Sequence, residues 1–324
     1  MASAIDFASY AATLRPVLEK AQAVTVVTHI NPDADTIATG LGIYRILKQT
    51  LGIPVEIVNR SDHVPHHLDF LPGFNKIKRK SDYAEGVLIA CDGADLSRFG
   101  IEAKGRYIVN IDHHVSNTRF GDLNVVAEDV ASSGEAAFEL FRLLYPIDAH
   151  AAQCFYTALF SDTRHFTTDS VDAETFRRAN VLIALGADPY RTAYNLTQRK
   201  SLASLRLLQR ALQSLHLYRD ATVGVMVLTP EDFDATGAVM SDLDGIVDYA
   251  KSLATVDIGV LISEFDDGSV RVSLRSKETD VNTIAKRLGG GGHRHAAGVI
   301  VPKAKAQEIL DTILHHISET KSEP

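Results

Sequence analysis

One short segment carries three side chains that could bind a metal ion or transfer protons. His29, Asp33 and Asp35 lie within seven residues, directly after the β-branched run 24–28 (VTVVT). Two carboxylates that are two positions apart repel each other unless a cation lies between them. The competing interpretation makes the aspartates a turn residue and a helix N-cap, and gives the histidine no role.

Further ionisable side chains follow other apolar runs. Asp92 comes after the run 87–90, and the triplet 112–114 (Asp-His-His) comes after the run 107–111. Asp162 ends an apolar helical stretch. Imidazole and carboxylate ligands without a thiolate favour Mn²⁺, with Mg²⁺, Co²⁺ or Zn²⁺ as alternatives. Two divalent ions about 3.5–4 Å apart would suit phosphoryl hydrolysis.

A parallel α/β sheet would bring these segments together, because such sheets place ligands at the carboxyl ends of their strands. The β-branched run 24–28 and the segment 54–58 (PVEIV) are predicted strands. Segments 86–90 and 107–111 are unbroken apolar runs, which are typical of parallel strands covered on both faces. Residues 133–215 have apolar side chains at three- and four-residue intervals, which indicates helices. The first part of the chain is therefore predicted to be a parallel-sheet domain with helices.

The last third changes to short strands that alternate with helices. Expected strands lie at 222–228, 256–262 and 269–274. We predict an α/β protein with a catalytic domain over residues 1–205 and a smaller mixed-sheet α/β domain over residues 206–324. A helical linker would join the domains, and the active site would lie in the cleft between them.

Length and charge limit the class of protein. The chain has 324 residues, which fits two domains, and a formal net charge of −8. This acidic balance disfavours a protein that tracks along nucleic acid, because such binding needs Lys and Arg to displace counterions. The apolar runs are far shorter than a membrane span, the N-terminus lacks a secretory pattern, and Cys91 and Cys154 form no C-x-x-C motif. We expect a cytoplasmic protein with no membrane partner.

Five motifs, in order, resemble the DHH phosphoesterase superfamily. They are His29-x-Asn31-Pro32-Asp33-Ala34-Asp35, Asp92, Asp112-His113-His114, Asp162 and the glycine-rich segment 289–298 (GGGGHRHAAG). The last resembles the signature of the associated C-terminal substrate-binding domain, so the resemblance spans nearly the whole chain. The length and this signature are most similar to the NrnA type, which are nano-RNases and 3′-phosphoadenosine-5′-phosphate (pAp) phosphatases.

The resemblance implies two divalent metal ions that share the ligand Asp92. The other ligands form one set for each ion: His29 and Asp33 for the first, and Asp35, His113 and Asp162 for the second. His114 would face the scissile phosphate. A metal-bridging hydroxide would attack the phosphorus directly, without a covalent enzyme intermediate.

The resemblance also implies a substrate grip in the second domain. Arg275 and Ser276 resemble the family's phosphate-binding arginine segment, and a guanidinium binds phosphate through two parallel hydrogen bonds. Backbone amides of the glycine run could form an anion-binding concavity, while the competing interpretation is a flexible hinge. The residues concerned are Gly290, Gly291, Gly292 and His293.

One residue departs from the family pattern. Many relatives have glycine after the Asp-Thr pair of the fourth motif, where this chain has Arg164. The sequence leaves open whether Arg164 contacts the substrate phosphate or braces its loop.

These observations predict an enzyme that cleaves di- to pentanucleotides of RNA or DNA to mononucleotides, and pAp to AMP. A cyclic or linear dinucleotide phosphodiesterase would keep the same metals. A pyrophosphatase or exopolyphosphatase of the same superfamily fits less well, because the glycine-rich signature suggests a nucleotide. A non-catalytic nucleotide-binding module should have lost a metal ligand, whereas every expected ligand is present. The apolar helical stretch 201–217 could support a homodimer.

Overall fold

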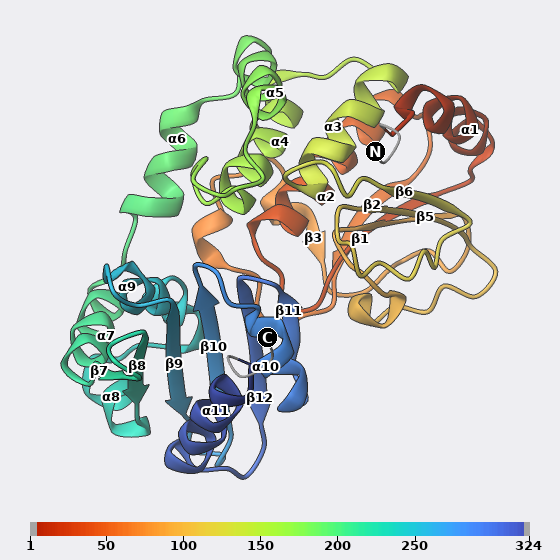
Figure 1. Cartoon of the computed structure of the whole chain (residues 1–324). Coiled ribbons are helices and arrows are strands. Elements are labelled where there is room, and N and C mark those ends of the chain that lie inside the picture. The colour runs from red at the N-terminus through yellow and green to blue at the C-terminus, as the bar shows by residue number, and fades with distance from the viewer. Residues whose placement is uncertain (1–4, 321–324) are drawn as a thin grey trace. The chain divides into compact units, whose positions relative to one another are not determined.

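The computed structural model describes residues 5–320. The chain divides into two compact units, residues 1–199 (unit 1) and residues 200–324 (unit 2), as Figure 1 shows. Each unit contains its own six-stranded sheet and its own buried apolar core. The predicted α/β class, with a parallel sheet followed by a mixed sheet, is confirmed.

Unit 1 is a parallel sheet with most of its helices after the last strand. Its strands are β1 (Val24–Thr28), β2 (Val55–Asn59), β3 (Ile77–Lys78), β4 (Val87–Cys91), β5 (Tyr107–Asp112) and β6 (Leu123–Val126). Its helices are α1 (Phe7–Lys20), α2 (Ala34–Thr50), α3 (Ser133–Leu144), α4 (Ala149–Asp162), α5 (Ala173–Ala184) and α6 (Pro189–Ala193). The 3₁₀ helices η1 (His66–Leu68), η2 (Phe74–Lys76) and η3 (Leu96–Phe99) lie in loops, and a π-helical turn spans Tyr194–Gln198. The strand order is β3-β2-β1-β4-β5-β6.

Both faces of this sheet are covered, which explains the unbroken apolar runs. Val26 and Ile89 pack into the larger core with residues of α1 to α4. Val27 and Leu88 point the other way and pack against Phe99 of η3. The strands predicted from these runs are confirmed.

The carboxyl ends of the central strands meet at one edge. Thr28 of β1 pairs with Cys91 of β4, and Cys91 pairs with Ile111 of β5. Helix α2 begins at this edge, with Asp33 as its N-cap, and packs against α3 and α4. The residues that follow β1, β4 and β5 therefore lie side by side.

Unit 2 is a mixed sheet with helices. Its strands are β7 (His216–Tyr218), β8 (Val223–Leu228), β9 (Ile258–Glu264), β10 (Val270–Ser276), β11 (Gly291–His293) and β12 (Ala296–Val301). Its helices are α7 (Leu202–Gln213), α8 (Pro230–Thr236), α9 (Ile246–Ser252), α10 (Val281–Arg287) and α11 (Ala306–Thr320), with the 3₁₀ helix η5 (Met240–Leu243). The order is β11-β12-β10-β9-β8-β7, in which β8 and β9 are parallel and the other pairs are antiparallel.

The glycine run begins by ending helix α10. Gly289 adopts φ of 85°, and its amide donates to the carbonyl of Lys286 at 3.0 Å. The amide of Gly290 donates to the carbonyl of Ala285 at 2.8 Å. These two bonds form a Schellman motif, which satisfies carbonyls at the end of the helix. The amide of Gly290 is therefore used by the helix cap rather than offered to a ligand.

The rest of the run enters the sheet. Gly291–His293 form β11, and Gly292 pairs with Ala297 of β12. A Cβ atom on Gly290 would lie 2.3 Å from the carbonyl oxygen of Gly298, far inside contact distance. The close approach of two backbone segments thus requires glycine here, so the run is an ordered hairpin strand and not a hinge.

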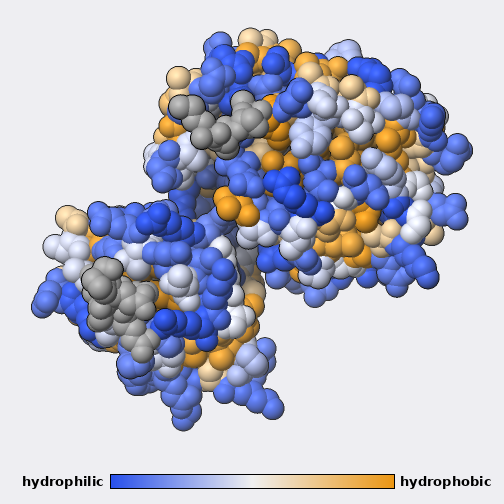
Figure 2. Space-filling model, turned by 45° about the vertical axis from the view of Figure 1, so that its right-hand side comes forward, coloured by the Kyte–Doolittle hydropathy of each residue, from blue (hydrophilic) through white to orange (hydrophobic). Residues whose placement is uncertain are grey.

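The surface is largely hydrophilic on the face shown in Figure 2, where hydrophobic residues form separate patches. The stretch predicted to support a homodimer contains α7, on which Leu202, Leu205 and Leu212 keep 63%, 52% and 42% of their surface exposed. Among residues 5–320, the structure contains no helix long and apolar enough to cross a membrane.

Candidate metal centre

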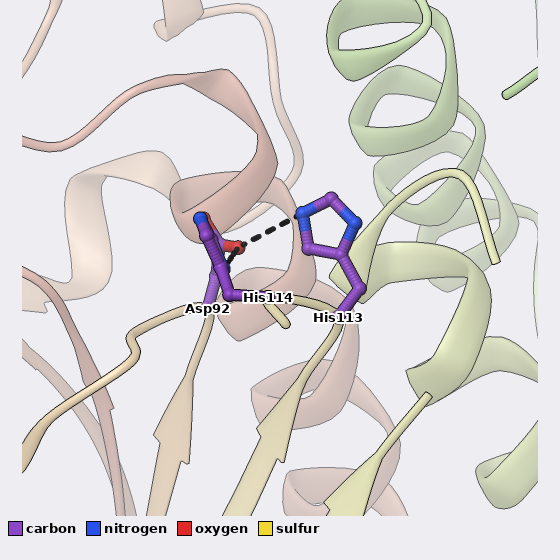
Figure 3. A group of neighbouring side chains, drawn as sticks. All are labelled: Asp92, His113 and His114. Carbon is purple, nitrogen blue, oxygen red and sulfur yellow. Dashed lines mark ion pairs between the residues drawn. The ribbon is translucent and has the colours of Figure 1, made fainter. Parts of the chain in front are cut away.

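Asp92 lies at the centre of a cluster of histidines and aspartates at the carboxyl edge of the parallel sheet. Its Oδ2 atom is 3.6 Å from Nε2 of His29, which follows β1. Its Oδ1 atom is 3.8 Å from Nε2 of His113 and 3.8 Å from Nδ1 of His114, which follow β5. Figure 3 shows Asp92, His113 and His114 just beyond the strand ends, with both imidazoles beside the carboxylate.

Three groups of residues offer ligand atoms that lie within 4.8 Å of one another. The groups are His29, Asp33 and Asp92; Asp35, His113 and Asp162; and Asp92, His113 and His114. The structure therefore brings all six predicted ligands into one cluster, and Asp92 belongs to two of the groups. His114, expected to face the phosphate, also lies within reach of a shared cation.

Asp33 fits both interpretations of its segment, as a helix N-cap and as a candidate metal ligand. Its Oδ1 atom accepts a hydrogen bond from the amide of Thr36 at 3.1 Å, which caps helix α2. The same oxygen lies 3.8 Å from Nε2 of His29, and 60% of the side chain is exposed. Asp33 is thus a helix cap and a candidate ligand at once.

Asp35 is buried and its carboxylate is fixed by the N-terminus of α3. The amides of Ser133 and Gly134 donate to Oδ2 at 2.8 Å and to Oδ1 at 3.0 Å. The hydroxyl of Thr39 also donates to Oδ1 at 3.0 Å. The N-terminus of a helix favours a negative charge, and these three hydrogen bonds fix the orientation of the Asp35 side chain.

Ser133 connects the two buried carboxylates. Its amide holds Asp35, and its hydroxyl donates to Oδ1 of Asp92 at 2.8 Å. The sequence interpretation missed this residue. The spacing of Ser132 and Glu135 is a capping-box pattern, which could have placed the start of a helix here but not the contact with Asp92.

Gly134 allows helix α3 to come this close. A Cβ atom at this position would lie 2.3 Å from Cβ of Ala158 on α4 and 3.3 Å from Oδ1 of Asp35. Any side chain would push α3 away from α4 and from the carboxylate. The glycine is therefore a requirement of the site as well as of the packing.

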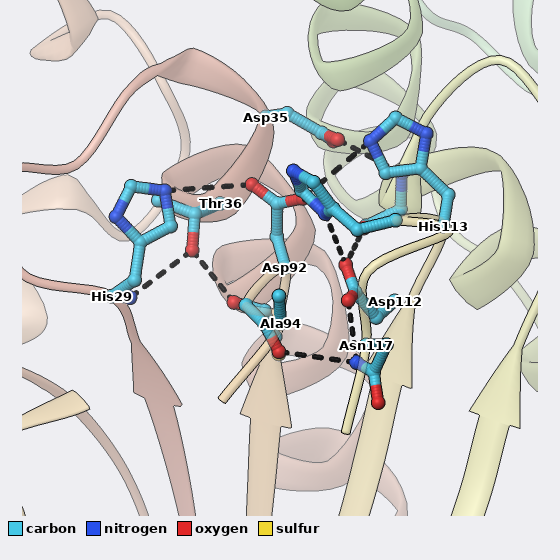
Figure 4. Close-up of polar contacts among 12 residues, drawn as sticks. His29, Asp35, Thr36, Asp92, Ala94, Asp112, His113 and Asn117 are labelled. Carbon is cyan, nitrogen blue, oxygen red and sulfur yellow. Dashed lines mark hydrogen bonds and ion pairs between the residues drawn. The ribbon is translucent and has the colours of Figure 1, made fainter. Parts of the chain in front are cut away.

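His114 is oriented by a buried carboxylate. Its Nδ1 atom lies 2.6 Å from Oδ1 of Asp112, and Asp112 is fully buried. The other oxygen of Asp112 accepts from Nδ2 of Asn117 at 2.5 Å. Figure 4 shows the contact between Asp112 and Asn117, close to Asp92. Sequence reasoning quoted Asp112 in its motif without a role, and its role here is to hold the ring of His114.

Charges in the cluster shift the pKa values of its members. Burial disfavours the charged form of His29, but the hydrogen bond to Asp92 and the charges of Asp33 and Asp92 raise its pKa to about 9. Burial also opposes the charge on His114, and Asp112 with Asp92 raises its pKa to about 9. Burial, reinforced by the charge of Asp92, raises the pKa of Asp35 well above its usual value.

The chemistry of the donors fits a divalent cation. Burial and the charge of Asp92 raise the pKa values of Asp35 and Asp162, so these carboxylates need a nearby positive charge to stay ionised together with Asp92. Cys91, next to Asp92, is fully buried, and burial raises the pKa of its thiol, so it remains neutral. The site thus offers imidazole and carboxylate ligands without thiolate, a set that suits hard or intermediate divalent ions.

Arg164 lies in an unusual turn directly after helix α4. Arg164, His165 and Phe166 have φ of 45°, 66° and 63°, in the left-handed region that L-residues avoid. Phe166 stacks on Phe176 with ring centroids 5.3 Å apart, and it contacts Phe160 edge-on at 5.8 Å. This aromatic packing holds the strained turn beside Asp162.

In unit 2, two of the predicted substrate-binding residues share one row of the sheet. Arg275 on β10 and His293 on β11 both pair with Ala296 of β12. Residues directly opposite in antiparallel strands project to the same face, so Arg275 and His293 flank the small side chain of Ala296. His293 is exposed and Arg275 is half-buried.

Ser276 has a different environment from its neighbour Arg275. It is buried, and its hydroxyl donates to the carbonyl of Thr279 at 2.5 Å and lies 3.2 Å from Nδ1 of His295. These contacts fix the turn after β10.

Comparisons with known proteins agree with the motifs. Residues 23–159 match the DHH family, N-terminal domain, and residues 222–319 match the DHHA1 domain. The bifunctional oligoribonuclease and PAP phosphatase NrnA of Thermus thermophilus is 30% identical over 304 residues, which are 91% of this chain and 89% of that protein. The protein of the same name from Bacillus subtilis is 25% identical over 283 residues, 84% of this chain and 87% of that protein.

A solved structure shows the same fold throughout. An exopolyphosphatase-related protein from Bacteroides fragilis superposes with a TM-score of 0.89 at 23% identity, covering 99% of this chain and 98% of that one. The resemblance inferred from the five motifs is confirmed. The chain belongs to the DHH family, in the form in which a DHHA1 domain follows the DHH domain, and the NrnA proteins are its homologues.

Proposed function

We propose that this protein is a metal-dependent phosphoesterase that cleaves short oligonucleotides to mononucleotides and pAp to AMP. Its NrnA homologues are named for these two activities, which are both hydrolyses of phosphoester bonds. The observation that carries the proposal is the position of Asp92. Its carboxylate belongs to two groups of His and Asp side chains whose ligand atoms lie close enough to hold a metal ion. A nucleotide-binding module without catalysis would not need this arrangement.

Two divalent ions would occupy the cluster, with Mn²⁺ as the first candidate and Mg²⁺, Co²⁺ or Zn²⁺ as alternatives. His29 and Asp33 would hold one ion, Asp35, His113 and Asp162 would hold the other, and Asp92 would contact both. Bound there, such ions lower the pKa of a coordinated water and neutralise charge on phosphoryl oxygens.

Other residues of the chain would orient the metal ligands and stabilise charge on the substrate phosphate. Ser133 and the N-terminus of α3 keep Asp35 and Asp92 in place before any substrate arrives. His114 would donate a hydrogen bond to the scissile phosphate, and its contact with Asp112 raises its pKa, which favours the protonated ring. Asp112 keeps the ring of His114 in the orientation for that contact.

Unit 2 would supply residues that bind the substrate. Arg275 and His293 project from one face of its sheet, with Ala296 between them, so a phosphate or a nucleotide could contact both. Gly291 and Gly292 in β11 give the ligand close access to backbone. Ser276 supports Arg275 through the turn that it fixes. In unit 1, Arg164 is a further candidate for a phosphate contact.

A substrate panel tests the proposal. Purified protein with Mn²⁺ is expected to release mononucleotides from di- to pentanucleotides of RNA, and phosphate from pAp. Parallel reactions with DNA oligonucleotides, cyclic and linear dinucleotides, and pyrophosphate rank the alternatives. Absence of product from both oligonucleotides and pAp, with metal bound, would refute the assignment.

Two further assignments accompany this function. We place the protein in the cytoplasm, because Cys91 and Cys154 are both free and buried, and reduced thiols are typical of that compartment. We also propose a homodimer through the exposed leucines of α7, which light scattering of the wild type and of Leu202→Glu would test. Dissociation of a wild-type dimer by this substitution is expected, and a monomeric wild type would refute the dimer.

A further inference from the structure

Three basic side chains of unit 1 line a hollow outside the metal centre. Arg60, Arg79 and Lys80 surround a volume of about 420 Å³. Arg60 directly follows β2, and Arg79 and Lys80 directly follow β3. Because all strands of this sheet are parallel, the hollow lies at the same carboxyl edge as the metal centre.

The hollow carries a net positive charge. Arg60 donates from Nη1 to the carbonyl of Arg79 at 2.9 Å, which joins the two loops. Arg79 pairs with Asp62 at 2.5 Å, and both of these side chains are exposed. Among the described residues 5–320, Asp62 is the one carboxylate that forms an ion pair with a side chain of the hollow. Like charges that surround one space repel each other, and a bound anion would relieve this repulsion.

The strand order and registers show how far the hollow lies from the cluster of His and Asp side chains along the carboxyl edge of the sheet. Thr28 of β1 pairs with Asn59 of β2, so Arg60 lies next to His29 where the strands end. Parallel strands lie about 4.8 Å apart, so the ends of β2 and β3 are roughly 10 and 14 Å from the end of β4, where Asp92 lies. These distances exceed the separation of the two phosphates on one ribose, so the hollow would be reached only by a phosphate of another linked nucleotide.

We propose that Arg60, Arg79 and Lys80 form an anion subsite that binds a backbone phosphate of an oligonucleotide one or more nucleotides away from the cleaved bond. The inference rests on the proposed function and specifies how longer substrates are distinguished from pAp. Contacts with backbone phosphates depend on the charge and spacing of the phosphates, so binding at this subsite does not depend on base sequence. Its contribution depends on salt, because each phosphate contact releases counterions.

A double substitution tests the subsite. Arg60→Gln with Lys80→Gln removes two positive charges from the hollow in the full-length chain. Lys48→Gln with Lys104→Gln is the matched control, because these exposed lysines lie away from the carboxyl edge and removing them changes the net charge equally. Arg60→Lys with Lys80→Arg keeps both charges and tests whether charge, rather than a particular shape, is what binds.

Two measurements separate this inference from the proposed function. The first is the binding of a fluorescein-labelled pentanucleotide in EDTA, followed by anisotropy over a salt series. We expect about fivefold weaker binding for the Gln pair, and a slope of log K against log salt that is shallower by about 0.7 per lost contact. The control pair and the charge-keeping pair should bind like the wild type.

The second measurement is hydrolysis with Mn²⁺. The KM for the pentanucleotide should rise in the Gln pair, while hydrolysis of pAp should stay within twofold of the wild type. Unchanged pentanucleotide binding by the Gln pair, or an equal loss in the control pair, would overturn the subsite. A wild type that hydrolyses neither substrate would refute the proposed function, while the anisotropy would still decide the subsite.

Discussion

The two sheets of this protein gather functional side chains in different ways. In the parallel sheet of unit 1, all strands end at the same edge. Five of the six candidate metal ligands come from the residues after β1, β4 and β5, and Asp162 comes from the end of helix α4. In the mixed sheet of unit 2, neighbouring strands mostly run in opposite directions, and Arg275 and His293 lie within strands on either side of Ala296. One candidate site lies at an edge of its sheet, and the other lies on a face of its sheet.

The two arrangements depend on different supports. The candidate site at the edge needs hydrogen bonds from outside the sheet. Residues that follow the end of a strand make no backbone hydrogen bonds to neighbouring strands, so other groups must hold them in place. Ser133, Thr39 and Gly134 supply these bonds. The face site needs close backbone packing, which Gly290 and Gly292 permit. Substitution of the residues that hold the ligands in unit 1 should therefore change metal binding, and substitution of Gly290 or Gly292 in unit 2 should change stability.

The largest effect is expected for Asp92→Asn. This change removes the charge shared by two ligand groups, and asparagine tolerates the left-handed φ of 63° at this position. Hydrolysis should fall about a thousandfold or more, and Mn²⁺ binding by calorimetry should be lost, with the fold intact. Asp95→Asn is the control, because Asp95 caps η3 outside all three groups. Hydrolysis within tenfold of the wild type would contradict the edge site.

Gly290→Ala tests the role of packing in unit 2. Its Cβ atom would meet the carbonyl of Gly298 at 2.3 Å, so the hairpin must shift, and we expect a loss of about 2–3 kcal/mol in the free energy of unfolding in urea. Gly291→Ala is the matched control, since its Cβ would meet nothing nearer than 3.9 Å. Equal stability of the two variants would show that the glycine run is not constrained as the hairpin requires.

Ser133→Ala tests whether outside support positions the ligands of unit 1. Loss of the hydroxyl leaves Oδ1 of Asp92 without its 2.8 Å donor, and loss of an orienting bond of this kind weakens metal binding about 10–100-fold. Titration calorimetry with Mn²⁺ measures the change. Ser132→Ala removes the cap of α3 and should cost about 1 kcal/mol of stability. The support is disproved if Ser132→Ala weakens metal binding as strongly as Ser133→Ala.

The smallest effect is expected for Arg164→Gly. Glycine accepts the φ of 45° without strain, which gains about 1 kcal/mol, although its greater freedom in the unfolded chain offsets part of this gain. Thermal unfolding should therefore show equal or slightly higher stability. The KM for pAp then separates the two roles left open by the sequence, because it rises only if the guanidinium contacts phosphate. A clear loss of stability would show that Arg164 braces its loop.

The sequence was sufficient to predict most of the edge site. Apolar runs identified the central strands, and the ionisable residue after each run identified the edge. His29 and Asp92 could be placed in one site because parallel strands end together. No pattern of this kind exists for the face site, since the pairing of β11 with β12 depends on strand registers that a glycine run does not specify.

The residues that hold the candidate ligands in place could not be predicted, because they lie far from those ligands in the sequence. Ser133 lies 98 positions from Asp35, and only the packing of α3 against α2 brings them together. The left-handed turn at Arg164 has no signal in the sequence either, because arginine rarely adopts this conformation. It follows from the aromatic packing of Phe166, which is a property of the folded chain.

The double role of Asp33 limits what a single substitution there can reveal. The carboxylate that lies beside His29 also begins helix α2, so folding and ligand chemistry depend on one side chain. Asp33→Ala would remove both, and a loss of activity could not be attributed to either. Asp33→Asn keeps an equally good helix cap and removes only the charge. The pair together separates the stability of the helix from the affinity of the ion, a distinction that no other candidate ligand of this site allows so directly.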